Sequence, residues 1–119
     1  MSKPLLLGHR GARRYAPENT TAAFELALAH GCDGFEFDVR LTADRRCVIC
    51  HDPRLGRRNI EKSRYDQLAP GTPCLPEVLE NFSRRAFLDI ELKVSGLEND
   101  VAGMLREHPP QRGCFISSF

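Results

Sequence analysis

The segment that decides the fold is GFEFDVR, residues 34–40, in which apolar and charged side chains alternate strictly. In a β-strand successive side chains point to opposite faces, so two phenylalanines and a valine share one face and Glu36, Asp38 and Arg40 share the other. Two carboxylates at this spacing can hold a hard cation such as Mg²⁺ or Ca²⁺, which prefers oxygen ligands. The alternative is a half-exposed strand whose charges face water, and this segment alone does not decide between the two.

Length and composition bound the possible functions. The chain has 119 residues, enough for one domain, and a net charge of +1, which favours no polyanionic partner such as nucleic acid. Among five cysteines, Cys47 and Cys50 form the only CxxC spacing, and they lie in an apolar run with no second pair to complete a zinc site. The leucine run at residues 5–7 is too short for a signal peptide or a membrane span, so we expect a cytoplasmic protein without a membrane span.

The N-terminal part of the chain is typical of a β-α-β unit. The apolar run at residues 5–8 predicts a buried strand that leads into the motif HRGA. Asn19 or Thr20 then caps a helix whose apolar residues recur at helical spacing up to Gly31. Because the strand over 34–40 follows this helix, we expect the two strands to be parallel with a right-handed crossover.

The segment after the first motif strand predicts a β-hairpin. A second β-like run, CVICHD at residues 47–52, follows a connection that is too short for a parallel crossover, so the two strands must be antiparallel. If Asp44 and Arg45 form the turn, His51 lies directly opposite Asp38. The hairpin is therefore expected to bring an imidazole within reach of the carboxylates.

The rest of the chain alternates between helix and strand signals. We expect an irregular excursion over 53–72, a helix over 75–82, a strand over 86–94, a helix over 97–107 and a further strand from residue 114. The strand over 86–94 alternates like the first one and places Asp89, Glu91 and Lys93 on one face. Two strands that each have one apolar and one charged face fit an interior lined with polar groups at the mouth of a barrel.

The predicted strand ends together carry groups that suit phosphoryl chemistry. In a parallel barrel, functional groups collect at the C-terminal ends of the strands. Here these groups are two imidazoles, three carboxylates, a guanidinium and an ammonium, from His9, His51, Glu36, Asp38, Glu91, Arg10 and Lys93. Carboxylates can hold a divalent cation, imidazoles can act as acid and base, and the two basic side chains can hold an anion, which favours metal-assisted phosphoryl chemistry.

The ordered motifs resemble those of the glycerophosphodiester phosphodiesterase family. The motifs are GHRGA at 8–12, PENT at 17–20, EFDV at 36–39, LTAD at 41–44, HD at 51–52 and ELK at 91–93. The resemblance implies a TIM-type (β/α)₈ barrel. It also implies a small-molecule substrate, a glycerophosphodiester, which is hydrolysed to an alcohol and glycerol 3-phosphate.

The same resemblance implies a role for each candidate site residue. One divalent cation, Mg²⁺ or Ca²⁺, would be bound by Glu36, Asp38 and Glu91. General acid/base catalysis would fall to His9 and His51, one activating the attacking oxygen and the other protonating the leaving alkoxide. The substrate phosphate would be contacted by Arg10 and Lys93, whereas Glu18 is expected to be structural and to pair with Arg10.

Chain length adds a further expectation. A (β/α)₈ barrel takes about 250 residues, so residues 1–119 are expected to form the N-terminal half of the catalytic domain, with about four barrel strands and a short β-hairpin excursion after the second. Two other functions stay open. One is a related lysophospholipase D or sphingomyelinase D-like activity, and the other is an inactive fragment or pseudoenzyme that only binds metal or phosphate.

Overall fold

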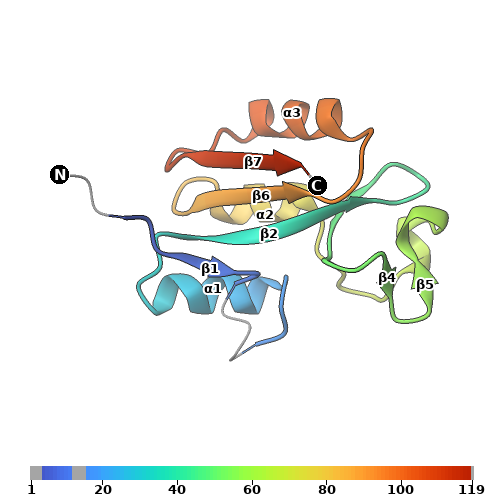
Figure 1. Ribbon diagram of the computed structural model, residues 1–119, viewed down its shortest axis with the longest axis horizontal. Helices are drawn as coiled ribbons and strands as arrows, with labels where there is room; N and C mark the ends of the chain where they lie inside the picture. Colours follow the sequence, from blue (N-terminus) through green and yellow to red (C-terminus); the bar gives the residue numbers. More distant parts are fainter. Residues whose placement is uncertain (1–3, 12–15, 119) are drawn as a thin grey trace.

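The computed structural model describes residues 4–11 and 16–118 and shows a mainly parallel sheet with helices between its strands (Figure 1). The parallel strands are β1 (Leu7–His9), β2 (Gly34–Leu41), β6 (Phe87–Leu92) and β7 (Cys114–Ser118). The helices are α1 (Thr21–Ala29), α2 (Leu75–Phe82) and α3 (Glu98–Glu107). The sheet order is β1-β2-β6-β7, β3 (Cys47–Ile49) pairs antiparallel with the end of β2, and β4 (Arg54–Leu55) and β5 (Arg58–Asn59) form a separate hairpin.

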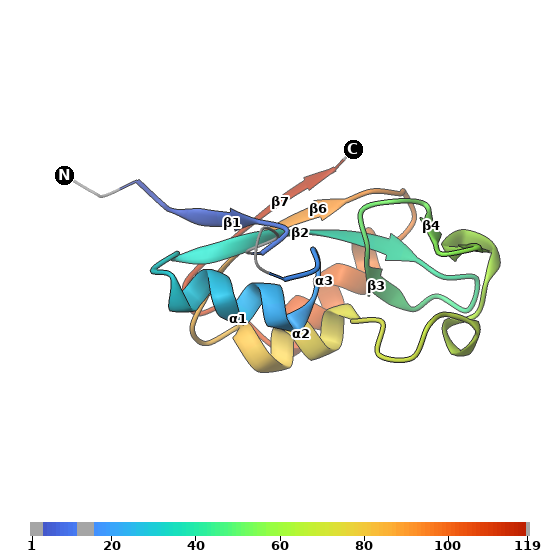
Figure 2. The ribbon, with the colours of Figure 1, turned by 90° about the horizontal axis from the view of Figure 1, so that it is seen from below.

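The core lies between the sheet and its helices. Figure 2 shows α1, α2 and α3 on the same side of the sheet. The apolar side chains of β2 point into this layer, where the ring of Phe35 stacks on Phe24 at a centroid distance of 4.1 Å and meets the edge of Phe82 at 5.1 Å. Each fully buried ring contributes about 1.5–3 kcal/mol relative to exposure. The apolar face of β2 thus packs against the helices, and its charged face points to the side of the sheet away from them.

Local sequence signals account for the ends of the helices. Thr20 is the N-cap of α1, and its hydroxyl oxygen accepts a hydrogen bond from the backbone N–H of Ala23 at 3.2 Å. Gly31, with φ +92°, follows this helix in a conformation that favours glycine. Helix α2 spans the predicted residues, Leu75–Phe82, and has Pro76 in its first turn. The β-α-β arrangement predicted for the N-terminal part is confirmed.

The predicted register of the β2–β3 hairpin is wrong by one residue. Val39 pairs with Ile49, and β3 ends there, so His51 lies in the following loop and not opposite Asp38. The reason is the turn, because Thr42 pairs with Arg46 and leaves three residues in the loop where the sequence analysis assumed two. Arg45, the last of the three, has φ +62°, which is the left-handed position typical of three-residue hairpin loops.

The excursion after β3 is more ordered than its polar composition predicts. In addition to the β4–β5 hairpin, it contains two short 3₁₀ helices, Ile60–Lys62 and Tyr65–Gln67. Ile60 and Leu68 are buried against Val48 of β3, so a second small apolar cluster fastens the excursion to the sheet. The prediction of an irregular segment was wrong because isolated apolar residues in a polar run have no periodicity to reveal them.

The parallel sheet is open at both of its outer strands. β1 and β7 each pair with one neighbour among the described strands. On and beside these strands lie exposed apolar side chains, with Leu6 exposed by 58%, Phe115 by 62% and Ile116 by 44%. Unpaired strand edges readily take up another strand, and this sheet therefore has two edges available for pairing.

Candidate active site

Two adjacent strands bring the three predicted carboxylates together. β2 and β6 are parallel neighbours, and in their register Asp38 lies beside Glu91. Glu36 precedes Asp38 by two residues and therefore shares its face of the sheet. Glu36, Asp38 and Glu91 each offer a carboxylate oxygen, and these oxygens lie within 4.8 Å of one another. The strand pairing thus forms the acidic group that the alternation of the two strands predicted.

Asp38 is the buried centre of this group. Its Oδ2 accepts a hydrogen bond from Asn19 Nδ2 at 3.1 Å and lies 3.5 Å from Arg10 Nε, while its Oδ1 lies 3.9 Å from Lys93 Nζ. Lys93 Nζ also lies 3.3 Å from Glu91 Oε2. Within the described residues, Oδ1 of Asp38 is buried and has no hydrogen-bond partner. An acceptor in that position is costly unless a cation or a donor reaches it.

The environments of the other two carboxylates differ. Burial, together with the charge of Asp38, raises the pKa of Glu36 to about 7, although the backbone N–H of Arg10 donates to its Oε1 at 3.2 Å. Burial also acts to raise the pKa of Glu91, but hydrogen bonding to Asp38 and Lys93 outweighs it and leaves that pKa below the usual value. The site therefore concentrates negative charge that its own basic residues balance only in part.

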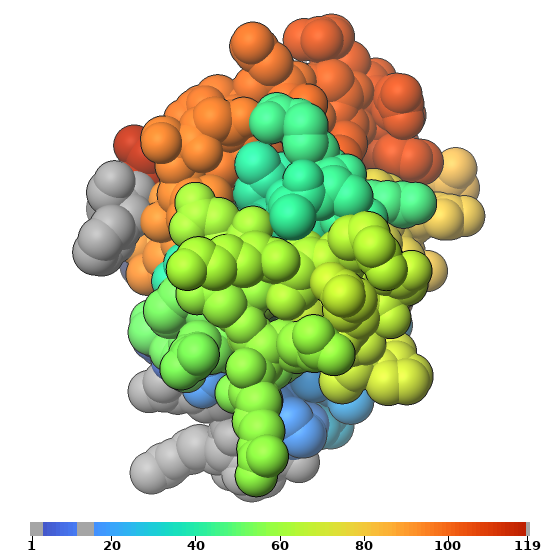
Figure 3. Space-filling model, turned by 90° about the vertical axis from the view of Figure 1, so that its right-hand side faces the viewer, coloured from blue at the N-terminus to red at the C-terminus, as the bar shows by residue number. Residues whose placement is uncertain are grey.

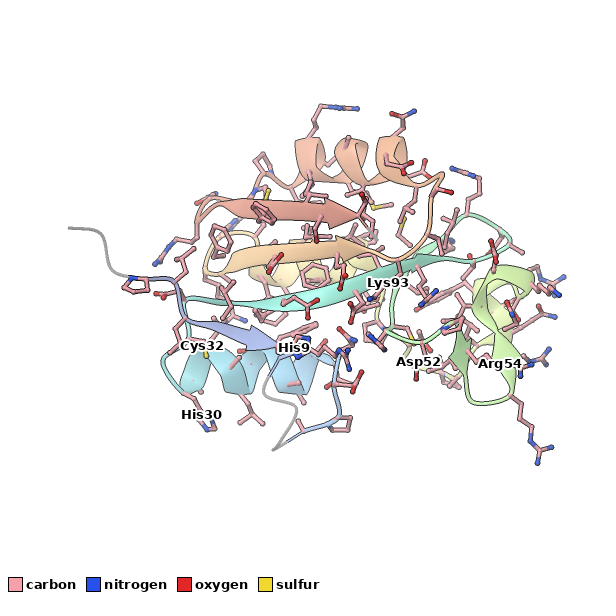
Figure 4. All side chains as sticks on the ribbon, in the orientation of Figure 1. His9, His30, Cys32, Asp52, Arg54 and Lys93 are labelled. Carbon is pink, nitrogen blue, oxygen red and sulfur yellow. The ribbon has the colours of Figure 1, made fainter. Side chains whose placement is uncertain are left out.

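The two predicted catalytic histidines occupy different positions. His9 is the last residue of β1, and its Nε2 lies 3.6 Å from Glu36 Oε1, beside the carboxylates (Figure 4). His51 follows β3, and its Nδ1 lies 2.8 Å from Asp52 Oδ1. Arg40 anchors the backbone at this point, donating from Nε and Nη2 to the carbonyl oxygen of His51 at 3.0 and 2.7 Å. The structure thus places His9 in the acidic group and His51 on the loop beside it.

Arg10 and Gly11, the two residues directly after β1, make close contacts with neighbouring segments. The predicted ion pair is present, with Arg10 Nη1 3.2 Å from Glu18 Oε2. Gly11 has φ +80°, and a Cβ at this position would lie 2.7 Å from the backbone of Ala23, so only glycine lets the loop approach α1 so closely. This approach brings Arg10 over β2, where it reaches both Asp38 and Glu18.

A cavity of about 470 Å³ borders this site on the side of the β4–β5 hairpin. Three segments line it: the residues before α1, the segment from the end of β3 to the turn after β4, and residues 69–73. Figure 3 faces this end of the molecule, with the excursion in green at the centre and blue atoms from the start of α1 below it. Asn19 and His51 belong to the cavity wall, and Asn19 also contacts Asp38, so the cavity and the acidic group are adjacent.

Comparison with known proteins identifies the family. The sequence model of the glycerophosphoryl diester phosphodiesterase family matches residues 9–101 of this chain. The chain belongs to this family. A glycerophosphodiester phosphodiesterase from Bacillus altitudinis is 34% identical over 140 residues, and the match covers 96% of this chain and 57% of the relative. The chain thus spans slightly more than half the length of the curated relatives that it matches.

Solved structures of glycerophosphodiester phosphodiesterases share the fold. The enzyme from Thermotoga maritima superposes with a TM-score of 0.86 at 31% identity, covering 100% of this chain and 56% of that chain. A phosphodiesterase from Oleispira antarctica, solved with the product sn-glycerol-3-phosphate, superposes with a TM-score of 0.86 at 32% identity, covering 98% of this chain and 57% of that chain. These relatives are TIM barrels, and the described sheet supplies four parallel strands of that fold. The predicted fold class is confirmed.

Asn19 is a site residue that the sequence analysis missed. The PENT motif of this family offers both Asn19 and Thr20 as caps, and the structure gives the cap to Thr20 alone. Asn19 is buried with φ +56°, a left-handed conformation that asparagine tolerates well. Its side chain donates to Asp38 Oδ2 and accepts from the Asp38 backbone N–H at 3.4 Å. The available signal was the presence of two capping residues for one helix.

Proposed function

We propose that residues 1–119 form the N-terminal half of a catalytic domain that hydrolyses glycerophosphodiesters to an alcohol and glycerol 3-phosphate. One observation carries the proposal: the carboxylates of Glu36, Asp38 and Glu91 lie within 4.8 Å of one another at the side where the parallel strands end, next to His9. Functional groups of TIM-barrel enzymes lie at that side. The product found in the Oleispira antarctica relative supports the choice of substrate class.

The donor set fits a hard divalent cation, Mg²⁺ or Ca²⁺. All three candidate ligands, Glu36, Asp38 and Glu91, are carboxylates, which such ions prefer over nitrogen or sulfur. The buried Asp38 Oδ1 and the raised pKa of Glu36 both fit a missing positive charge. A cation held there supplies electrostatic stabilisation of the phosphoryl oxygens.

The chain's own side chains would perform the remaining steps. Arg10 and Lys93 reach the same carboxylate from two sides and are well placed to hold the phosphate of the substrate. His9 and His51 would serve as the general acid/base pair, one taking the proton of the attacking oxygen and the other protonating the leaving alkoxide. Asp52, 2.8 Å from Nδ1 of His51, orients that ring.

The proposed function is tested with a completed enzyme, in which residues 1–119 are joined to the C-terminal part of the barrel of the Thermotoga maritima relative. We expect it to release glycerol 3-phosphate from glycerophosphocholine in the presence of Mg²⁺ or Ca²⁺. Lysophosphatidylcholine and sphingomyelin, assayed in parallel, test the lysophospholipase D and sphingomyelinase D alternatives. A completed enzyme that folds but leaves glycerophosphocholine intact would exclude the proposed activity.

Replacing Glu36 with glutamine should weaken divalent cation binding. The substitution keeps the shape of the side chain but removes a charged ligand. We therefore expect calorimetric titration of the completed enzyme to show a clearly lower affinity for Mg²⁺ and Ca²⁺. Asp89→Asn is the matched control, because Asp89 pairs with Glu36 across the strands and lies outside the group of three ligand atoms. Unchanged affinity in Glu36→Gln, or an equal loss in Asp89→Asn, would remove Glu36 from the metal site.

Removing the side chain of Asn19 should also weaken the metal site, through Asp38. Asn19→Gly keeps a residue that accepts φ +56° but loses both hydrogen bonds to Asp38. Groups that orient metal ligands typically contribute about 10–100-fold to affinity, and we expect a loss in that range with an unchanged circular dichroism spectrum. Asn19→Asp, whose side chain cannot donate a hydrogen bond to Asp38, should bind the cation at least as weakly as Asn19→Gly. Full cation affinity in both variants would contradict a role of Asn19 in orienting Asp38.

A small-molecule substrate is the partner that we propose, and the oligomeric state stays open. None of the described helices has the length and apolar character needed to cross a bilayer. All five cysteines are free thiols, which a reducing compartment favours. The cytoplasmic location stays a prediction.

A further inference from the structure

The cavity beside His51 is placed to receive part of the substrate. Its wall includes Asn19, which contacts the carboxylate Asp38, and His51, which is one of the two proposed acid/base residues. Given the proposed function, a diester whose phosphate lies at the carboxylates has two organic arms, and one of them can extend past His51 into this space. Its volume of about 470 Å³ lies in the range of pockets that hold small molecules.

The charged residues of the cavity wall differ in their partners. Glu18 pairs with Arg10 at 3.2 Å, and Asp52 pairs with His51 at 2.8 Å. Arg54, on β4, also lines the cavity, and its side chain has neither a hydrogen-bond nor an ion-pair partner among the described residues. Of the three fully charged residues that line this wall, Arg54 is therefore the one that no described side chain contacts through a hydrogen bond or an ion pair.

The surroundings of Arg54 strengthen the same charge. Residues 54–62 carry four basic side chains and one acidic side chain, a net charge of +3, so the remainder of the chain carries −2. Three further basic residues of this segment, Arg57, Arg58 and Lys62, are exposed and likewise have no side-chain partner in the described part of the chain. A cluster of one sign beside a cavity raises the local concentration of ions of the opposite sign.

We propose that this cavity binds the alcohol part of the diester and that Arg54 selects alcohols that carry an anionic group, such as a phosphate. A guanidinium binds phosphate through a bidentate pair of hydrogen bonds. The apolar part of the wall, which includes Ile49, Leu55 and Pro73, accommodates the carbon skeleton of the alcohol. The inference deepens the proposed function and depends on it, because it assigns the substrate class of the same site.

The test compares two diesters that differ by one phosphate group on the alcohol, glycerophosphoinositol and glycerophosphoinositol 4-phosphate. Each is equilibrated by dialysis with the 119-residue chain and Mg²⁺, a method that counts bound ligand per chain in any association state. We expect the phosphorylated diester to bind about tenfold more tightly, the gain typical of one charge-assisted contact. Phosphorus NMR monitors whether the diesters stay intact, and if they are cleaved the same ratio is taken from kcat/KM.

Two variants locate the source of the preference. Arg54→Gln should reduce the tenfold ratio to about one. Arg57→Gln removes the same charge from the turn of the same hairpin, outside the cavity wall, and should keep the ratio. An equal loss in both variants would show a general attraction of the basic segment and overturn the assignment to Arg54.

The remaining outcomes separate this inference from the proposed function. Equal binding of both diesters to the unmodified chain would overturn the anionic selectivity and leave the proposed function standing. Tighter binding of glycerophosphocholine than of the phosphorylated diester would likewise overturn it. Binding of neither inositol diester would overturn this inference, whereas the proposed function is decided separately, by the turnover of glycerophosphocholine by the completed enzyme.

Discussion

His9→Ala and His51→Ala each lower kcat of the completed enzyme on glycerophosphocholine by about 10²–10⁴-fold, the usual loss for a general acid or base. The reason is that each imidazole is proposed to move one proton, at the attacking oxygen or at the leaving alkoxide. The affinity for Mg²⁺ should change little, since the three predicted ligands are carboxylates. Steady-state kinetics and calorimetric titration of the same preparations measure the two effects separately.

His30→Ala is the matched control for the histidine variants. His30 caps the end of α1, far from His9 in Figure 4. This variant should keep full turnover. Near-full activity in His9→Ala or in His51→Ala would deny that residue an acid/base role, and a large effect for His51 would show that its loop position still reaches the substrate.

The 119-residue chain on its own should self-associate and have at most trace activity. β1 and β7 are unpaired edges of a parallel sheet among the described strands, and Phe115 of β7 is exposed by 62%. The charged face of β2 and β6 also lacks the opposite wall that a closed barrel provides, so the site would be open to water. Light scattering coupled to size exclusion measures the mass, near-UV dichroism reports packing, and turnover reports activity.

The completed enzyme and an edge variant are the controls for this second experiment. Joining the missing barrel strands should give an active monomer, because it covers both edges. Ile116→Lys, placed on the exposed edge strand, should reduce the association of the 119-residue chain, since charged edge residues oppose strand pairing. A well-packed, active monomer of the unmodified chain would show that four strands suffice and that the half-barrel interpretation fails.

Local patterns in the sequence determined much of the fold. The alternation over residues 34–40 decided which face of β2 is apolar, because side chains of a strand alternate whatever surrounds it. The limits of α2 follow from Pro76 at its start and from apolar residues at helical spacing, and α1 begins after Thr20, one of its two predicted caps. The resemblance of the ordered motifs to the phosphodiesterase family predicted the fold class, a TIM-type barrel, from the sequence alone.

Tertiary structure decided the relations between distant segments. A third loop residue, Ala43, shifted the hairpin register and moved His51 away from Asp38. The choice between a two-residue and a three-residue turn depends on backbone conformations, such as the positive φ of Arg45, that residue type only biases. The role of Asn19 depends on its hydrogen bonds to Asp38 of β2. The raised pKa of Glu36 depends on its burial and on the charge of Asp38, with a further contribution from Glu91 on the neighbouring strand. Periodicity and capping act within a few residues and can be read from the sequence, whereas register, burial and the partners of buried charges arise only when separate segments pack together.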